Sequence, residues 1–209
     1  MTTHRDDDME PFTSLIAVAV PLDIVNVDTD RIVPARFLRR PRSEGYENFL
    51  FRDLRESDPG FVLDRPEYGG AKILVAAENF GCGSSREAAV WALAGFGLRA
   101  WIAPSFGDIF FENSFKNGAL PIILPLERVA ALRAQLAANP GAQVTIDLPA
   151  QTVTLPDGSV ERFEVDPFRK ECLVAGIDEI DLTLRRAGEI AAFEARRRND
   201  APWLFHDYH

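Results

Sequence analysis

The sequence predicts an α/β fold with a mixed sheet, and three observations lead to this prediction. Between residues 73 and 138, short apolar runs typical of buried strands alternate with helix-like segments. Further on, Pro156-Asp157-Gly158 separates two strand-like runs, which predicts an antiparallel hairpin. Two helix-like segments then follow the hairpin. Because strands that alternate with helices usually run parallel, the two kinds of pairing together predict a mixed sheet.

The N-terminal third predicts one strand and a long connection. A strand is expected at residues 15–20, and an apolar run at residues 24–27 leads into the polar turn 28–31. A stretch rich in Arg, Gly and Pro then extends to residue 70, with short helices expected near residues 46–55. Such a long connection is either functional or disordered. Order is favoured by the aromatic residues Tyr46, Phe49, Phe51 and Phe61.

The remaining elements follow from apolar periodicity and from turn residues. Strands are expected at residues 73–77, 99–103 and 120–124, and helices at residues 85–96, 108–115 and 127–138. Three more strands are expected at residues 143–147, 151–155 and 160–165, before helices near residues 167–175 and 178–198. We therefore predict one domain over residues 11–198, between a disordered tail at residues 1–10 and a flexible tail at residues 199–209.

Composition limits the kinds of partner and the cellular compartment that the sequence allows. The net charge of -9 over 209 residues argues against nucleic acid as a partner, and an anion site must therefore be locally basic. The first apolar stretch, residues 15–20, is too short for a signal core or a membrane span. We expect a cytoplasmic protein without membrane contact.

Histidine and cysteine are too few for several kinds of catalysis. His4, His206 and His209 all lie near the ends of the sequence, so Ser-His-Asp and Cys-His catalysis are disfavoured unless a tail folds inward. Cys82 and Cys172 cannot by themselves ligate an iron–sulfur cluster or a structural zinc ion. We predict no metal site in this chain, and any metal chemistry requires a partner chain.

The most informative segment is residues 78–87, Glu-Asn-Phe-Gly-Cys-Gly-Ser-Ser-Arg-Glu, where a strand turns into a helix. Helix N-termini carry unpaired N–H groups and a positive dipole end, so Ser84, Ser85 and Arg86 predict an anion site. The structural alternative is a capping box formed by Ser84 and Glu87. Other motifs fail: Arg86 replaces the third glycine of a dinucleotide fingerprint, and Glu87 replaces the second glycine of a nucleophile elbow.

With three further stretches, this segment resembles the small subunit of bacterial 3-isopropylmalate dehydratase, which is similar to the swivelling domain of aconitase. The further stretches are residues 21–30, 58–63 and 102–110, and Lys116-Asn117-Gly118 and Pro121 also fit. The resemblance covers roughly residues 11–195 and implies an aconitase-swivel-like β/β/α domain with a C-terminal hairpin and helices. One position departs: Ala88 stands where the family usually has histidine.

The resemblance implies a hydro-lyase of two chains, either a heterodimer or a heterotetramer. The large subunit would hold a [4Fe-4S] cluster, and this chain would hold no cofactor but would supply the group that removes a proton. Ser84 matches the catalytic serine, acting as an alkoxide, while Ser85 and Arg86 would bind a carboxylate of a small dicarboxylate substrate. Thr29 and Asp30 match a second polar turn at the cleft, although an Asx-type structural turn remains an alternative. Cys82 matches no cluster ligand.

The substrate's variable side chain would face residues 35–45. Phe37 and Leu38 suit an isopropyl group, whereas Arg36, Arg39 and Arg40 suit a carboxylate. The resemblance implies dehydration of 2-isopropylmalate to isopropylmaleate and rehydration to 3-isopropylmalate, in leucine biosynthesis. Ala88 keeps open a related hydro-lyase of the citraconate, 2-methylmalate or dimethylmaleate type. A non-catalytic anion-binding module and a hydrolase that uses Cys82 are the alternatives outside this class.

Overall fold

The computed structural model describes residues 9–205, apart from the side chains of Arg42 and Glu179. The chain divides into two compact units, residues 1–176 and residues 177–209, which are described separately. Of the two predicted tails, residues 1–8 and 206–209 lie outside the described residues, whereas residues 199–205 contain the end of the last helix and a 3-10 turn at Pro202–Phe205. The single domain predicted over residues 11–198 stays a prediction.

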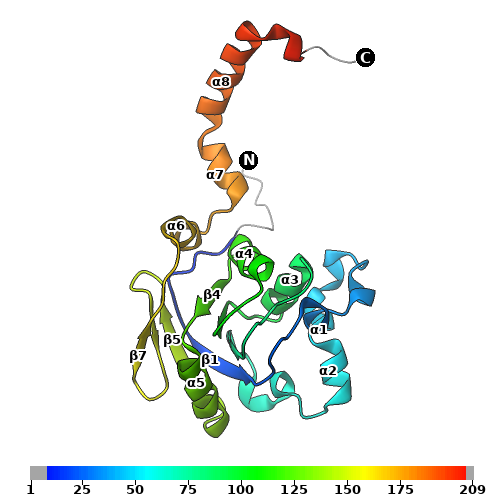
Figure 1. The fold of residues 1–209 in the computed structure, drawn as a ribbon, viewed down its shortest axis with the longest axis vertical. Coiled ribbons are helices and arrows are strands. Elements are labelled where there is room, and N and C mark those ends of the chain that lie inside the picture. Colours follow the sequence, from blue (N-terminus) through cyan, green and yellow to red (C-terminus); the bar gives the residue numbers. More distant parts are fainter. Residues whose placement is uncertain (1–8, 206–209) are drawn as a thin grey trace. The chain divides into compact units, whose positions relative to one another are not determined.

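The first unit is built on a seven-stranded mixed sheet, which confirms the predicted fold class (Figure 1). The strands follow the order β4-β3-β2-β1-β5-β6-β7. The four strands from β4 to β1 run parallel, whereas β5, β6 and β7 pair antiparallel. Their bounds are β1 Ser14–Leu22, β2 Ile73–Ala76, β3 Ala100–Ala103, β4 Leu120–Ile123, β5 Gln143–Asp147, β6 Thr152–Thr154 and β7 Val160–Arg162.

Helices cover both faces of this sheet. One face packs against α3 (Glu87–Gly95) and the long connection, and the other packs against α5 (Leu126–Ala138). The other helices of the first unit are α1 Thr29–Ile32, α2 Arg52–Ser57, α4 Asp108–Lys116 and α6 Pro167–Ala175. The second unit contains α7 Glu179–Arg185 and α8 Ala187–Asp200. No helix within residues 9–205 is long and apolar enough to cross a membrane.

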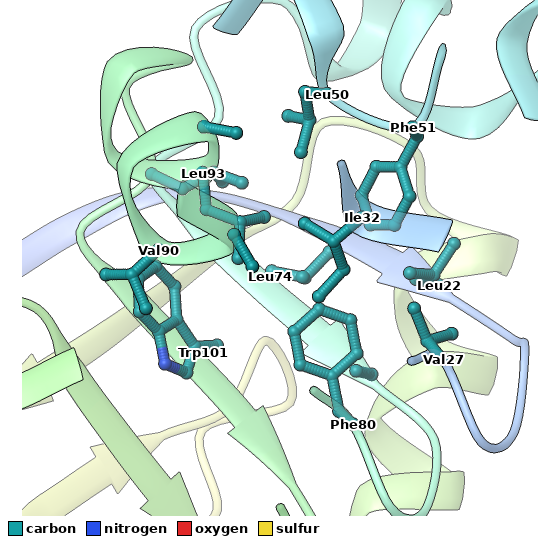
Figure 2. Close-up of a cluster of buried hydrophobic side chains, with 14 of the residues drawn as sticks. Leu22, Val27, Ile32, Leu50, Phe51, Leu74, Phe80, Val90, Leu93 and Trp101 are labelled. Carbon is teal, nitrogen blue, oxygen red and sulfur yellow. The ribbon is translucent and has the colours of Figure 1, made fainter. Parts of the chain in front are cut away.

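Side chains of the parallel strands alternate between two apolar cores, as the two-residue period of a strand requires. Leu74 and Trp101 face the core beneath α3, whereas their neighbours Ile73 and Ile102 face the core beneath α5. Figure 2 shows how strands, α3 and the connection fill the first core, through side chains that include Leu22, Val27, Ile32, Leu50, Phe51, Leu74, Phe80, Val90, Leu93 and Trp101.

The long connection is ordered, as its aromatic residues predict. Besides α2, it contains short 3-10 turns at Ala35–Phe37, Arg42–Glu44, Tyr46–Phe49, Val62–Asp64 and Pro66–Tyr68. Tyr46, Phe51 and Phe61 are buried in the first core. These aromatic side chains supply the apolar burial that holds a segment with little regular structure.

Several boundaries differ from those predicted. The polar turn at residues 28–31 becomes the start of α1, because Oδ1 of Asp28 accepts the N–H of Arg31 at 2.7 Å and caps the helix. The single helix expected at residues 178–198 is two helices, because Arg186 leaves helical geometry at φ -100° and ψ 14°. Elsewhere the observed elements lie within a few residues of the predicted ranges.

Candidate functional site

The candidate site is built on loops that leave the carboxyl ends of neighbouring parallel strands. Leu22 at the end of β1 is level with Ala76 at the end of β2. The loops that follow, residues 23–28 and 77–86, therefore start side by side. Ligand sites of open α/β sheets form at this edge, outside the carboxyl ends of the strands.

Hydrogen bonds join these two loops along their length. The N–H of Asn26 donates to the carbonyl oxygen of Glu78 at 3.0 Å, and the N–H of Gly81 donates to that of Val27 at 2.7 Å. The amide groups of the side chains of Asn79 and Asn26 also meet, with Nδ2 of Asn79 2.8 Å from Oδ1 of Asn26. The two loops consequently form one unit.

The loop after β3 supports the same unit from the other side. The N–H of Phe80 donates to the carbonyl oxygen of Ser105 at 3.1 Å, and the N–H of Gly107 donates to that of Phe80 at 2.9 Å. The hydroxyl oxygen of Ser105 accepts the N–H of Asn79 at 2.9 Å. A side chain at Gly107 would collide with the backbone of Gly81, so only glycine allows this approach.

The glycines around Cys82 have a conformational role. Gly81 has φ +72° and Gly83 has φ +91°, which are left-handed values that glycine adopts without a steric penalty. A Cβ atom at Gly81 would also overlap the ring of Phe110. These glycines bend the chain after β2 so that the serines reach the loop from β1.

Thr29 holds the turn of residues 82–86, called here the serine turn, through two hydrogen bonds to its backbone. Its N–H donates to the carbonyl oxygen of Cys82 at 2.9 Å, and its Oγ1 donates to the carbonyl oxygen of Ser84 at 3.0 Å. The side chain is only 2% exposed. Thr29 therefore contacts the backbone of the predicted catalytic serine, in a position that the sequence spacing does not reveal.

Asp30 and Arg86, both predicted to bind substrate, contact each other. Nη1 of Arg86 donates to Oδ1 of Asp30, which also accepts the N–H of Ala35 at 2.8 Å. The hydrogen bond from Arg86 lowers the pKa of the Asp30 carboxyl group below its usual range, with the N–H of Ala35 acting in the same direction. Since the side chain of Asp30 is 56% exposed, this ion pair contributes little stability, about 0–1 kcal/mol. Its main consequence is to orient the guanidinium group.

The structural alternative, a capping box formed by Ser84 and Glu87, is not what the structure shows. Helix α3 begins at Glu87, and its N-cap is Arg86, with φ -96° and ψ 102°; no described side chain caps this helix. The carbonyl oxygen of Ser84 accepts hydrogen bonds from Thr29 and from the N–H of Arg86, so the serine turn stays outside the helix. Ser84 and Ser85 are exposed at the surface.

The segment predicted to face the variable part of the substrate, residues 35–45, is partly buried against the first core. Phe37 and Leu38 are half-buried against the first core, and Phe37 stacks on Phe49 with ring centroids 4.4 Å apart. Nη1 of Arg36 donates to Asp53 at 3.0 Å. Arg39 and Arg40, the other two arginines predicted to suit a carboxylate, are exposed.

Ala88 lies inside α3 and is buried, with 6% of its surface exposed. It belongs to the first core, next to Ala89. A histidine at this position would have to displace neighbouring side chains in a close-packed core.

This chain's residues do not fit an iron–sulfur cluster. Cys82 is half-buried, and burial raises the pKa of its thiol, which disfavours the thiolate that a cluster requires. Cys172 lies on α6, a different element. Within residues 9–205, no group of three or more His, Cys, Asp or Glu side chains could hold a metal ion, and the three histidines lie outside that range.

Sequence reasoning missed the residues that position the site. Asp28 caps α1, and Asn26 and Asn79 join their loops through side-chain amides. The one local signal was the position of Asp28 before the residues of α1, which is typical of an N-cap. The contact between Asn26 and Asn79 has no signal in a single sequence.

Family models match three consecutive parts of the chain. The Aconitase C-terminal domain matches residues 9–127, and LeuD_N matches residues 130–167. The C-terminal domain of the 3-isopropylmalate dehydratase small subunit matches residues 179–207. The first of these matches contains the whole candidate site.

Relatives extend over almost the whole chain. The 3-isopropylmalate dehydratase small subunit of Magnetococcus marinus is 50% identical over 213 residues, which cover 95% of this chain and 100% of the relative. That of Paramagnetospirillum magneticum is 53% identical over 201 residues, which cover 94% and 100%. The crystal structure of 3-isopropylmalate dehydratase (leuD) from Methanocaldococcus jannaschii has a TM-score of 0.65 and 29% identity, and the match covers 86% of this chain and 99% of that one.

Proposed function

Because the chain belongs to the family of 3-isopropylmalate dehydratase small subunits, we propose that it works with a large subunit as a hydro-lyase. The reaction converts 2-isopropylmalate into 3-isopropylmalate by dehydration to isopropylmaleate and rehydration, a step of leucine biosynthesis. The observation that carries this proposal is the exposed Ser84, held by Thr29 and followed by an oriented Arg86.

Ser84 is the proposed proton acceptor. As an alkoxide it takes the proton from the carbon next to a substrate carboxylate, and the electrons of that C–H bond form the double bond as the hydroxyl group leaves. Rehydration reverses the proton transfer. A serine alkoxide requires strong local stabilisation, for which the N-terminus of α3 and the guanidinium group of Arg86 are the nearby positive groups.

Arg86 and Ser85 are the proposed carboxylate ligands. A guanidinium group has five N–H donors, so a substrate carboxylate can bind to Arg86 while Asp30 holds another donor. Each charge-assisted hydrogen bond of this kind contributes about 1.5–3 kcal/mol. Thr29 and Asp30 keep Ser84 and Arg86 in place through their hydrogen bonds.

The partner supplies what this chain does not contain. We propose a cytoplasmic complex, a heterodimer or heterotetramer, whose large subunit holds a [4Fe-4S] cluster with Lewis-acid chemistry. Cys82 and Cys172 do not provide a ligand set for this cluster. The roles assigned to this chain are therefore those of its own side chains.

The test is co-expression with candidate large subunits, followed by anaerobic purification and assay on 2-isopropylmalate, citraconate, 2-methylmalate and dimethylmaleate. We expect turnover of 2-isopropylmalate by the complex. The isolated chain, reconstituted with iron and sulfide, should show none.

Turnover by the isolated chain would overturn the two-chain proposal. A clear preference for 2-methylmalate or dimethylmaleate would assign the protein to a related hydro-lyase, with Ala88 as the first position to examine. A non-catalytic anion-binding role would leave every large subunit inactive with this chain.

A further inference from the structure

The stretch Lys116-Asn117-Gly118 ends helix α4, and the proposed function gives it no role. Asn117 is the C-cap residue of this helix, with φ -102° and ψ 18°. Its carboxamide bonds in two directions: Nδ2 donates to Oε1 of Glu87 at 2.8 Å, and Oδ1 accepts Nε1–H of Trp91 at 3.0 Å. Both partners lie on α3, so one amide group holds the first turns of α3 against the end of α4.

The bond to Glu87 acts on the serine turn, which carries Ser84, Ser85 and Arg86. Glu87 is the first residue of α3 and directly follows Arg86, the N-cap. The Arg86–Asp30 pair orients the guanidinium group, but it is too exposed to stabilise the backbone at Arg86 strongly. Since no described side chain caps α3, the bond between Glu87 and Asn117 anchors the start of α3 on one side of Arg86, while Thr29 holds the carbonyl oxygen of Ser84 on the other.

The bond to Trp91 acts on the segment of residues 35–45. The Trp91 ring meets the ring of Tyr46 edge-on, with centroids 5.6 Å apart and planes at 76°. Tyr46 is 4% exposed, and its hydroxyl group donates to the carbonyl oxygen of Arg40 at 3.0 Å. Trp91 and Tyr46 thus connect Asn117 to the backbone that carries the proposed specificity residues.

We propose that Asn117 is a positioning residue that holds the carboxylate-binding turn and the specificity segment in a common arrangement through α3. This inference rests on the proposed function. Asn117 acts through Glu87 on Arg86, and through Trp91 and Tyr46 on residues 38–40. These two connections, called here the Glu87 arm and the Trp91 arm, predict different kinetic effects. A merely structural role would not separate these effects.

Three substitutions separate the arms in the complex with the large subunit. Asn117→Ala removes the bonds to Glu87 and Trp91, together with the local bond to Asn113, and should lower kcat/KM for 2-isopropylmalate, by up to about 100-fold if the reacting groups shift by an ångström. Asn117→Asp keeps the acceptor for Trp91 but replaces the donor to Glu87 by a carboxylate oxygen that repels it, so KM should rise while selectivity is kept. Trp91→Phe removes the indole donor to Asn117 and also shortens the ring that meets Tyr46, so it should change the ratio of kcat/KM between 2-isopropylmalate and 2-methylmalate.

Asn139→Ala is the matched control. Asn139 is the C-cap of α5, and its Nδ2 donates to the carbonyl oxygen of Gln135 at 3.0 Å, just as that of Asn117 donates to Asn113 at 2.9 Å. This substitution removes the same local bond far from α3. It should leave KM, kcat and selectivity at wild-type values.

Hydrogen–deuterium exchange of the full chain alone gives a second readout, independent of turnover. Asn117→Ala should accelerate exchange at residues 86–90 and 38–40, and Asn139→Ala should not. Unchanged exchange in both segments would overturn the positioning role, as would a loss confined to kcat with KM and selectivity unchanged. An inactive wild-type complex would instead overturn the proposed function, while the exchange rates would still decide the role of Asn117.

Discussion

Thr29 donates a hydrogen bond from its hydroxyl group to the carbonyl oxygen of Ser84 at 3.0 Å, across 55 positions of sequence. The donor is buried, whereas the serine that it holds is exposed. A buried side chain, that of Thr29, thus forms a hydrogen bond with the backbone of the proposed catalytic residue. A buried donor with a fixed partner restricts where Ser84 can lie, and that restriction is testable.

Thr29→Val should weaken this placement. Valine keeps the shape of the side chain but removes the hydroxyl group, so the free energy of unfolding should fall by about 1 kcal/mol. Because the serine turn loses an anchor, kcat/KM of the complex should fall as well. Urea denaturation and steady-state kinetics measure the two effects, and Thr29→Ser, which keeps the hydroxyl group but loses a buried methyl group, should restore the kinetics. Wild-type kinetics with Thr29→Val would show that Ser84 is placed without this bond.

Ser84→Ala should abolish most activity without affecting stability. Since Ser84 does not cap α3, the free energy of unfolding should stay within about 0.5 kcal/mol of the wild type. Removal of a general base typically costs about 10²–10⁴ in rate. Ser57→Ala, at an exposed serine of α2, is the control. Near wild-type turnover by Ser84→Ala would refute the catalytic role.

Arg86→Lys should raise KM and lower kcat for 2-isopropylmalate. An ammonium group keeps the charge but cannot hold Asp30 and a substrate carboxylate with the planar set of donors that guanidinium provides. Steady-state kinetics of the complex measure both constants. If lysine supported wild-type KM and kcat, charge alone would suffice and the proposed geometry would be wrong.

Asp30→Asn should change the response of stability to acid. The hydrogen bond from Arg86 lowers the pKa of Asp30 in the folded chain, below an unfolded value of about 3.9. The stabilisation is therefore fully present above about pH 4 and is lost as the pH falls through the lowered pKa. The difference in unfolding free energy between wild type and Asp30→Asn should be constant from pH 7 to about pH 5 and shrink below pH 4. A difference that grew in acid would contradict the pairing.

Gly81→Ala should destabilise the domain more than Gly97→Ala. Both glycines have positive φ, +72° and +103°, so alanine is strained at either position, by about 1–2 kcal/mol. At Gly97 a new Cβ meets nothing within 4 Å, whereas at Gly81 it overlaps the ring of Phe110. Urea denaturation of both variants measures the difference. Equal losses would mean that the Phe110 contact relaxes without cost.

The sequence by itself determined most of the elements, and it predicted the chemistry of the site. Two-residue alternation and helical periodicity located the strands and helices, because each element buries its own apolar side chains. The Gly-Cys-Gly-Ser-Ser-Arg-Glu run indicated an anion-binding turn, because serine hydroxyl groups and an arginine at the start of a helix can bind an anion. The family followed from that run together with the longer pattern, and the relatives confirmed it.

Only the tertiary structure decided how these parts meet. It placed β1 between β2 and β5, paired Arg86 with Asp30, and connected Thr29 to Ser84. It also moved the start of α3 past the serines, because the carbonyl oxygen of Ser84 bonds to Thr29 and to Arg86 and the turn stays outside the helix. Each of these outcomes depends on a partner far away in the sequence, and local propensity carries no information about such a partner.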